Sequence, residues 1–198
     1  MIIIPTTGLK KNFEEAEIRI NEVKEYSKWI QVDIGDEIFS SGKTFELELL
    51  KKINFGSDEI LWDMHLMVKN PINWINKCIF AGASRIVGQV EMMEDREMFV
   101  KLIKDEGLEA GLAFDIETEI DNIPQETDII LLMGRKAGFG IYPFNDRVLN
   151  KIDEAKKYGK MVAVDGGVNT DNIRLLEKAG VDIVYSEINY FNLNGKNK

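Results

Sequence analysis

The stretch Ile60-Leu-Trp-Asp-Met-His-Leu-Met-Val-Lys-Asn-Pro71 decides the fold of this 198-residue chain. It predicts a short apolar strand over Ile60–Met67, followed by a helix that Asn70 caps and Pro71 opens. A strand that leads directly into a helix is the first half of a βαβ unit. The strand also carries His65, the only histidine of the chain. Burying a polar ring costs free energy unless it has partners, so His65 is a candidate functional residue.

The same strand–helix pattern repeats along the chain. Further strands rich in valine and isoleucine are predicted over Ile2–Pro5, Trp29–Ile34, Ala83–Val90, Leu108–Phe114, Thr127–Met133, Met161–Val164 and Asp182–Tyr185. Further helices are predicted over Asn12–Lys28, Phe45–Ile53, Asp95–Glu106, Ile116–Ile120, Asn145–Tyr158 and Thr170–Ala179. Continuous apolar strands are typical of a parallel sheet that is buried on both faces. About eight such units predict an α/β fold, a single-domain (β/α)8 TIM barrel over residues 1–198.

Two features qualify this fold. The alternative is a doubly wound open sheet, which would place a glycine-rich turn after the first strand, where only Thr6-Thr7-Gly8 occurs. The last segment, Tyr190–Lys198, is too short and too polar for a full closing helix. We therefore expect a truncated C-terminal helix, and we expect a partner subunit of a homo-oligomer to cover Phe191.

Composition narrows the possible partners. The chain has 25 basic and 34 acidic side chains, a net charge of −9, which argues against a nucleic-acid partner but not against a small phosphorylated one. No apolar run approaches the roughly 20 residues that span a bilayer, and Met1–Pro5 has no signal-peptide pattern. The single cysteine, Cys78, fits core packing in a helix and a cytoplasmic location.

Polar residues close three of the predicted strands: Gln31 with Asp33, then His65, then Asp165. Residues two apart on a strand share a face, and barrel active sites lie at the carboxyl ends of the strands. One imidazole, two carboxylates and the amide oxygen of Gln31 can form a site for Zn2+, Mn2+ or Fe2+. Two aspartates on opposite sides of a substrate can also exchange protons at a carbon next to a carbonyl, with a metal stabilising the enediolate.

Glycines follow the sixth and seventh strands, at Gly138-Phe139-Gly140 and Gly166-Gly167. Such glycines let backbone N–H groups approach a phosphate closely, and barrels often bind phosphate in this region. Each residue also has an ordinary interpretation when it is taken alone. Asp33 can cap a loop, His65 can be a hydrogen-bonded core histidine, and the glycines can form simple turns.

Five motifs together carry a family resemblance: Val32-Asp-Ile-Gly-Asp36, Asp63-Met-His-Leu-Met-Val-Lys-Asn-Pro71, Gly111-Leu-Ala113, Gly138-Phe-Gly140 and Val164-Asp-Gly-Gly-Val-Asn169. From about Pro5 to Phe191 the chain resembles ribulose-phosphate 3-epimerases. These are (β/α)8 metalloenzymes of the pentose phosphate pathway that interconvert ribulose 5-phosphate and xylulose 5-phosphate.

The resemblance implies roles for individual residues. Asp33 and Asp165 match the two catalytic aspartates, and His65 matches a histidine that binds the metal together with both of them. The implied cofactor is a divalent cation, Zn2+, Mn2+, Fe2+ or Co2+. The residues that match the substrate and phosphate contacts are Met67, Gly138, Gly140, Gly166 and Gly167.

The chain also departs from the family pattern. Gln31 and Gln89 stand where the family has histidines, and an amide oxygen is a weaker ligand for Zn2+ than an imidazole. Glu187 and Ile188 stand where the family has a Gly-Ser pair whose amides bind phosphate. A carboxylate there would repel a phosphate dianion, and Arg135 or Lys136 would have to offset it.

Three functions remain open from the sequence. The first is epimerisation of a keto-sugar phosphate by Asp33 and Asp165. The second is a barrel enzyme for a different sugar, with or without a phosphate, in which Glu187 recognises a hydroxyl or an amine. The third is a catalytically inactive homologue that binds another molecule.

Overall fold

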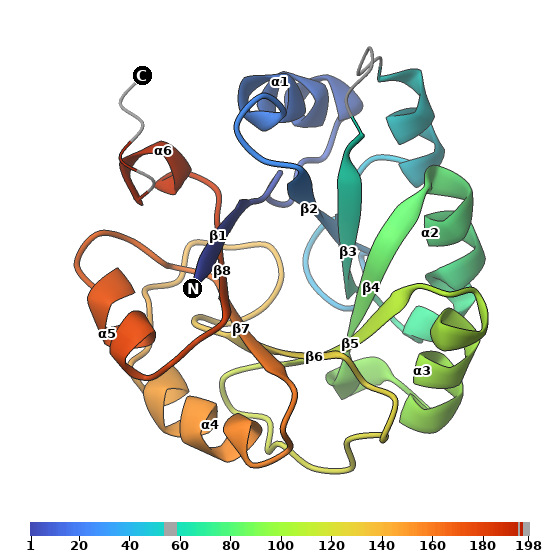
Figure 1. The fold of residues 1–198 in the computed structure, drawn as a ribbon. Helices are drawn as coiled ribbons and strands as arrows, with labels where there is room; N and C mark the ends of the chain where they lie inside the picture. Colours follow the sequence, from blue (N-terminus) through green and yellow to red (C-terminus); the bar gives the residue numbers. More distant parts are fainter. Residues whose placement is uncertain (54–58, 194, 196–198) are drawn as a thin grey trace.

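Eight parallel strands form the centre of the protein, as Figure 1 shows for the computed structural model, which describes residues 1–53, 59–193 and 195. In the sheet the strands follow the order β1-β8-β7-β6-β5-β4-β3-β2. Their bounds are β1 Ile2–Pro5, β2 Trp29–Gly35, β3 Leu61–Met67, β4 Ala83–Gln89, β5 Glu109–Phe114, β6 Ile129–Met133, β7 Met161–Asp165 and β8 Ile183–Ser186. The predicted (β/α)8 barrel is therefore confirmed, with strand ends within two residues of the predicted ones.

The barrel closes between β1 and β2. Outside the named strands, the described residues include one isolated parallel bridge, which joins Thr6 to Gln31. The backbone N–H of Thr7 donates to the carbonyl of Gln31 at 2.9 Å, and the N–H of Asp33 donates to the Thr7 hydroxyl at 3.3 Å. The Thr7 side chain thus adds a hydrogen bond between β1 and β2, where there is little backbone pairing.

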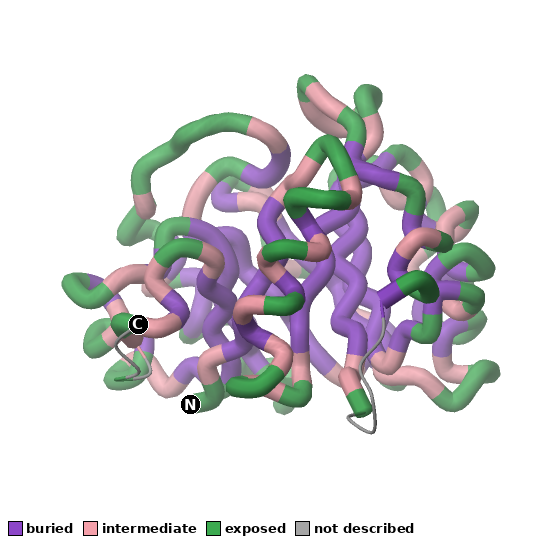
Figure 2. The backbone as a smooth tube through the Cα atoms, turned by 90° about the horizontal axis from the view of Figure 1, so that it is seen from above, coloured by how far each residue is buried: buried purple, intermediate pink, exposed green. Residues whose placement is uncertain are grey.

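Side chains alternate between the two faces of the barrel wall. The larger apolar cluster lies between the strands and the helices. Figure 2 shows that the buried residues are concentrated in the middle of the molecule. A smaller cluster fills the barrel interior and consists of Ile4, Val87, Ala113, Ile129, Leu131, Ala163, Ile183 and Tyr185. Both faces of each strand are covered, which explains why the strands read as continuous apolar runs.

The interior also contains a polar network below the mouth of the barrel. The Arg85 guanidinium donates to Asp63 at 2.9 Å and stacks 4.4 Å from the Trp29 ring, and the Tyr185 hydroxyl donates to the same carboxylate at 2.5 Å. Burial raises the pKa of Asp63, although Arg85 and Tyr185 oppose this rise. The network fills the lower barrel with paired polar groups instead of further apolar side chains.

The helices surround the strands (Figure 1). The α-helices are α1 Phe13–Val23, α2 Ile75–Ala81, α3 Arg96–Asp105, α4 Arg147–Lys156, α5 Ile173–Lys178 and α6 Tyr190–Leu193. Three 3-10 helices accompany them, η1 Leu47–Lys52, η2 Pro71–Trp74 and η3 Val90–Met92. Asn12 caps α1 as predicted, by accepting from the N–H of Glu15. The predicted helix over Phe45–Ile53 is the 3-10 helix η1, and the other helices are shorter than predicted.

Asn70 does not cap the helix after β3, so that prediction was wrong. Its backbone has a left-handed conformation, with φ 49° and ψ 76°, and its side chain makes no capping hydrogen bond. Pro71 opens the 3-10 helix η2, and α2 begins only at Ile75. Proline at the first position fits this entry because its missing N–H has no partner to lose there.

The helix predicted over Ile116–Ile120 is also wrong, because the segment forms turns without a helix. Lys151 of α4 accounts for this conformation. Lys151 is buried, and its ammonium group donates to the carbonyls of Asp115 and Thr118. The Asp115 carbonyl also accepts from the N–H of Thr118 at 3.1 Å, so the segment forms a single turn held by the lysine and not a longer helix.

Two further predictions concern Cys78 and the C-terminus. Cys78 is buried as predicted, and burial raises the pKa of its thiol to about 12, so it is a packing residue. The helix α6 is only four residues long, as the truncation predicts. Its Phe191 ring packs edge-on against Tyr26 of the same chain, with ring centroids 5.3 Å apart. Within the described residues, no helix is long and apolar enough to cross a membrane.

Candidate active site and metal centre

A cavity of about 320 Å³ opens at the carboxyl ends of the strands. Most of the predicted site residues line it: Asp33, Met67, Gly138, Gly140, Asp165, Gly166 and Gly167. The two remaining predicted residues, His65 and Gln31, are completely buried. The structure therefore brings the predicted residues together at one end of the barrel.

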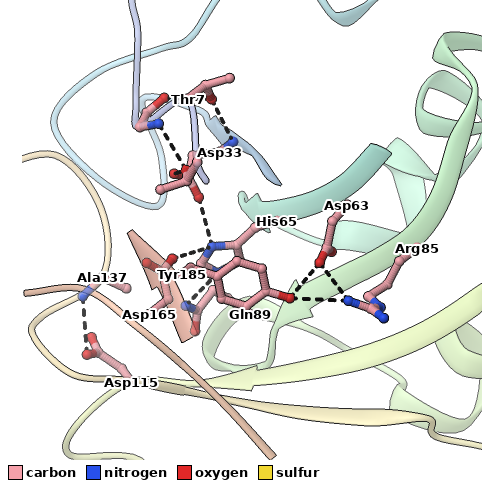
Figure 3. Close-up of polar contacts among 12 residues, drawn as sticks. Thr7, Asp33, Asp63, His65, Arg85, Gln89, Asp115, Ala137, Asp165 and Tyr185 are labelled. Atoms are coloured by element: carbon pink, nitrogen blue, oxygen red, sulfur yellow. Dashed lines mark hydrogen bonds and ion pairs between the residues drawn. The ribbon is translucent and has the colours of Figure 1, made fainter. Parts of the chain in front are cut away.

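Asp33, His65 and Asp165 come together from β2, β3 and β7 (Figure 3). The strand register places Asp33 directly beside His65. The imidazole Nδ1 lies 3.0 Å from Asp33 Oδ1 and 3.4 Å from Asp165 Oδ2. One ligand atom from each of the three residues lies within 4.8 Å of the others. The two carboxylates therefore converge on one ring nitrogen.

Burial and mutual charge shift the pKa values in this group. Desolvation and the facing carboxylate of Asp165 raise the pKa of Asp33, against the opposing contacts with His65 and Thr6. Desolvation disfavours the charged imidazole, but hydrogen bonds to Asp165 and Asp33 outweigh it and raise the pKa of His65 to about 9. Without a cation, the ring therefore holds a proton that partly neutralises the two carboxylates.

The donor set fits a divalent cation. Two carboxylates and one imidazole are ligands that Zn2+, Mn2+, Fe2+ and Co2+ all accept. Gln31 gives independent support, because neither its amide oxygen nor its amide nitrogen has a hydrogen-bond partner among the described residues. Gln31 lies on β2, two residues before Asp33 and on the same face. A buried amide without a partner is costly, and binding a cation through its oxygen would remove part of that cost.

Two residues, Thr6 and Gln89, make polar contacts in the site that were not assigned from the sequence. The Thr6 hydroxyl donates to Asp33 Oδ2 at 2.5 Å, and Thr6 lines the cavity. The Gln89 amide, oriented with its oxygen toward the ring, accepts from His65 Nε2 at 3.2 Å and donates to the Ala113 carbonyl at 3.2 Å. Gln89 shares the inward face of β4 with Val87, so strand alternation was a signal for its position.

The glycines that were predicted to bind phosphate line the cavity together with Glu187. Gly166 and Gly167 have φ values of 95° and 75°, and a Cβ at Gly167 would lie 3.1 Å from the Phe144 backbone. Other residue types rarely adopt such positive φ values, so the chain can turn here only with glycine. Glu187 lies in the cavity wall, as its alignment with the Gly-Ser position predicted.

The charge that offsets Glu187 comes from a residue that the sequence did not indicate. The Glu187 carboxylate pairs with Lys10 at 2.5 Å. Arg135 instead donates to the Gly140 carbonyl at 2.7 Å, and the Lys136 ammonium lies 5.8 Å from the centre of the Tyr142 ring. Lys10 is far from Glu187 in sequence, so only the folded chain reveals the pair.

Comparisons with known proteins identify the family of the chain. The model of the ribulose-phosphate 3 epimerase family matches residues 3–190. A ribulose-phosphate 3-epimerase from Chlamydia pneumoniae is 32% identical over 169 residues, which cover 80% of this chain and 73% of the relative. The enzyme of the same name from Escherichia coli (strain K12) is 32% identical over 164 residues, which cover 78% of this chain and 72% of the relative.

Solved structures show the same fold at lower identity. Phosphoribosyl anthranilate isomerase from Thermococcus kodakaraensis superposes on this chain with a TM-score of 0.62 at 19% identity. The superposed region covers 94% of this chain and 87% of the isomerase chain. That likeness supports the barrel alone, whereas the sequence relatives support a sugar-phosphate epimerase and argue against an inactive binding homologue. The chain belongs to the ribulose-phosphate 3-epimerase family.

Proposed function

We propose that the protein interconverts ribulose 5-phosphate and xylulose 5-phosphate, with Asp33 and Asp165 as the acid/base pair. The observation that carries this proposal is the approach of both carboxylates to His65 Nδ1, at 3.0 and 3.4 Å, where they also line the cavity. Epimerisation at C3 requires removal of a proton beside the C2 carbonyl and delivery of a proton to the opposite face. Two carboxylates from different strands can serve the two faces.

The surrounding residues support these proton transfers. The raised pKa of Asp33 makes it a stronger base than an ordinary aspartate, because desolvation and Asp165 disfavour its charged form. The Thr6 hydroxyl bonds one oxygen of Asp33 and so orients the other. Met67 and Met133 are nearly buried and line the same cavity, where they exclude water from the reacting carbon.

The residues that would hold a divalent cation are Asp33, His65, Asp165 and Gln31. When bound, the cation supplies positive charge for the negative charge that develops on the substrate oxygens. The amide oxygen of Gln31 favours harder ions, so we propose Mn2+ or Fe2+ ahead of Zn2+ and Co2+. Elemental analysis of the purified protein tests the identity of the metal.

Hydrogen exchange at C3 tests the reaction. The metal-loaded protein is incubated with ribulose 5-phosphate in heavy water, and we expect deuterium at C3 together with xylulose 5-phosphate. Asp165→Asn should abolish formation of the epimer, whereas Asp153→Asn, an exposed change on α4, should not. Absence of exchange with all four metals would contradict the reaction, and epimerisation by Asp165→Asn would contradict the acid/base pair.

A specific observation favours a second candidate, an epimerase for a non-phosphorylated sugar. Glu187 places a carboxylate in the cavity wall, where it could accept a hydrogen bond from a hydroxyl or an amine. A substrate without phosphate would meet no repulsion there. Binding of phosphate to the protein separates the two candidates, since only the first requires it.

The location and the assembly are also proposals. The buried free thiol of Cys78 suits a reducing compartment such as the cytoplasm. For the homo-oligomer, α6 leaves Phe191 only partly buried, although Tyr26 and Tyr190 contact its ring. Light scattering of the purified protein tests this, and a monomer at micromolar concentration would contradict it.

A further inference from the structure

We infer that Lys10 is a positioning residue for the substrate phosphate: it holds the Glu187 carboxylate against the loop after β1 and cancels its charge. This inference rests on the proposed function, because it assumes a phosphorylated substrate. It assigns a role to a side chain that does not itself line the cavity. It also explains how a chain with an acidic residue at this position can accept a phosphate dianion.

The contacts of Glu187 fix the direction of its side chain. Its carboxylate pairs with Lys10 at 2.5 Å, and the two side chains are 34% and 27% exposed. The same carboxylate occupies the space beside Gly8, where a Cβ would lie 2.4 Å from Glu187 Oε2. Gly8 is left-handed, with φ 66°. The loop after β1 therefore provides both the space and the cation that the acidic side chain needs.

The main chains of the loops after β1 and after β8 are held separately, by Arg19. Arg19 of α1 donates to the carbonyl of Glu187 and, at 3.4 Å, to the carbonyl of Thr6. Its guanidinium also lies 5.7 Å from the centre of the Phe191 ring. Because Arg19 fixes the main chain, loss of Lys10 should release the Glu187 side chain without displacing the loop.

The charges around the cavity make this pair important. Its wall contains three carboxylates, those of Asp33, Asp165 and Glu187, and a single cationic side chain, Arg135. A cation held by Asp33, His65 and Asp165 would offset the charge of the two aspartates. Without Lys10, the negative charge of Glu187 would face the phosphate dianion. Among the described lining residues, Arg135 alone would then offset that charge. Pairing with Lys10 leaves the net charge there positive.

The phosphate has open partners close by. Among the described residues, the backbone N–H groups of Gly166 and Gly167 donate to no protein acceptor. Both residues line the cavity together with Glu187. Amide donors of this kind recognise phosphate well but contribute only partial charges. The full charges of Arg135, Glu187 and Lys10 therefore decide whether a dianion is accepted.

A double-mutant cycle tests the inference on the full-length, metal-loaded protein. The variants are Lys10→Met, Glu187→Gln and the double variant, with Lys101→Met as the matched control because Lys101 pairs with Asp105 on α3. Calorimetry measures the Kd for inorganic phosphate, and steady-state assays give KM and kcat for ribulose 5-phosphate. Circular dichroism confirms that each variant is folded.

We expect Lys10→Met to weaken phosphate binding roughly tenfold and to raise KM by the same factor, with kcat retained. Glu187→Gln should bind phosphate at least as well as the natural protein. The double variant should return to within about twofold of the natural protein, because removing the carboxylate removes the need for the lysine. Lys101→Met should change neither constant.

Three outcomes would overturn the inference. If the double variant binds as weakly as Lys10→Met, the lysine contacts phosphate directly. If Lys10→Met binds as well as the natural protein, the pair does not govern binding. If the natural protein binds no phosphate, the premise is wrong. Failure of the proposed reaction gives a different result. The variants would then show the expected Kd values for inorganic phosphate, but the natural protein would not epimerise ribulose 5-phosphate.

Discussion

Gln89 fixes the ring of His65 through the nitrogen that does not face the aspartates. Its amide oxygen lies 3.2 Å from Nε2, while Nδ1 faces Asp33 and Asp165. A hydrogen bond to one ring nitrogen determines which nitrogen is free to bind a metal. Gln89 therefore keeps Nδ1 of His65 directed at the site.

Removing this hydrogen bond should weaken metal binding. We expect Gln89→Leu to lower the affinity for Mn2+ by about 10- to 100-fold, because the ring loses the partner that orients it. Competition with a chelator of known affinity measures the change. Gln125→Leu, an exposed substitution, is the control and should leave the affinity unchanged. An unaltered affinity in Gln89→Leu would show that the barrel walls alone orient His65.

Gln31 should show opposite effects on stability and on metal binding. Its amide is buried without a hydrogen-bond partner among the described residues, so Gln31→Leu should stabilise the metal-free protein by about 1 kcal/mol in urea unfolding. The same variant should bind Mn2+ more weakly, since it lacks the amide oxygen. Gln31→His should instead raise the affinity for Zn2+. Unchanged affinities in both variants would exclude Gln31 as a ligand.

The metal-free protein should lose stability as the pH rises from about 6.5 to 9. The folded pKa of His65, about 9, lies above its ordinary value of 6.5, so the folded ring keeps a proton that the unfolded ring releases. The resulting stabilisation is complete below pH 6.5 and is lost as the pH rises through 9. Its size is on the order of 3 kcal/mol. The raised pKa of Asp33 acts in the same direction at lower pH.

Urea unfolding at several pH values measures this dependence. Saturating Mn2+ should flatten it, because a ligand imidazole must be free of that proton. His65→Gln should remove the slope between pH 6.5 and 9. A slope that persists in this variant would assign the proton to another group.

Lys151 should be important for both stability and substrate binding. Lys151→Met removes the ammonium donor from the carbonyls of Asp115 and Thr118, and among the described residues only the Asp115 carbonyl keeps another donor, the N–H of Thr118. The loss should cost about 1–3 kcal/mol in thermal or urea unfolding. Asp115 also accepts from the N–H of Ala137, just before the Gly138–Gly140 loop, so KM should rise. Lys157→Met, exposed at the end of α4, should change neither quantity. Equal stability of the two variants would contradict this role.

The sequence was sufficient to predict the barrel and the grouping of the three candidate site residues. The positions of the strands follow from the local sequence, in which short apolar runs precede amphipathic segments. The bounds of β1 to β8 were therefore predicted within two residues of the observed ones. Asp33, His65 and Asp165 were predicted to meet because the carboxyl ends of parallel strands share one edge. Their meeting depends on topology, which the strand–helix repeat already implies.

The errors occurred where distant side chains override local preference. Residues 116–120 have helical spacing, but Lys151 of α4 holds the carbonyls of Asp115 and Thr118. Asn70 is a favoured capping residue, but its backbone takes a left-handed conformation instead. The Lys10–Glu187 pair links residues 177 positions apart, so no local pattern indicates it.

The single bridge between Thr6 and Gln31 makes the barrel a rolled sheet with a seam, and the active site lies on that seam. Gln31 and Asp33 belong to one edge strand, and Thr6 follows the other. A cation or substrate that contacts both edges would link the two strands and stabilise the closed barrel. Amide hydrogens of β1 and β2 should therefore exchange with solvent faster than those of β4 and β5, and occupancy of the site should slow them selectively.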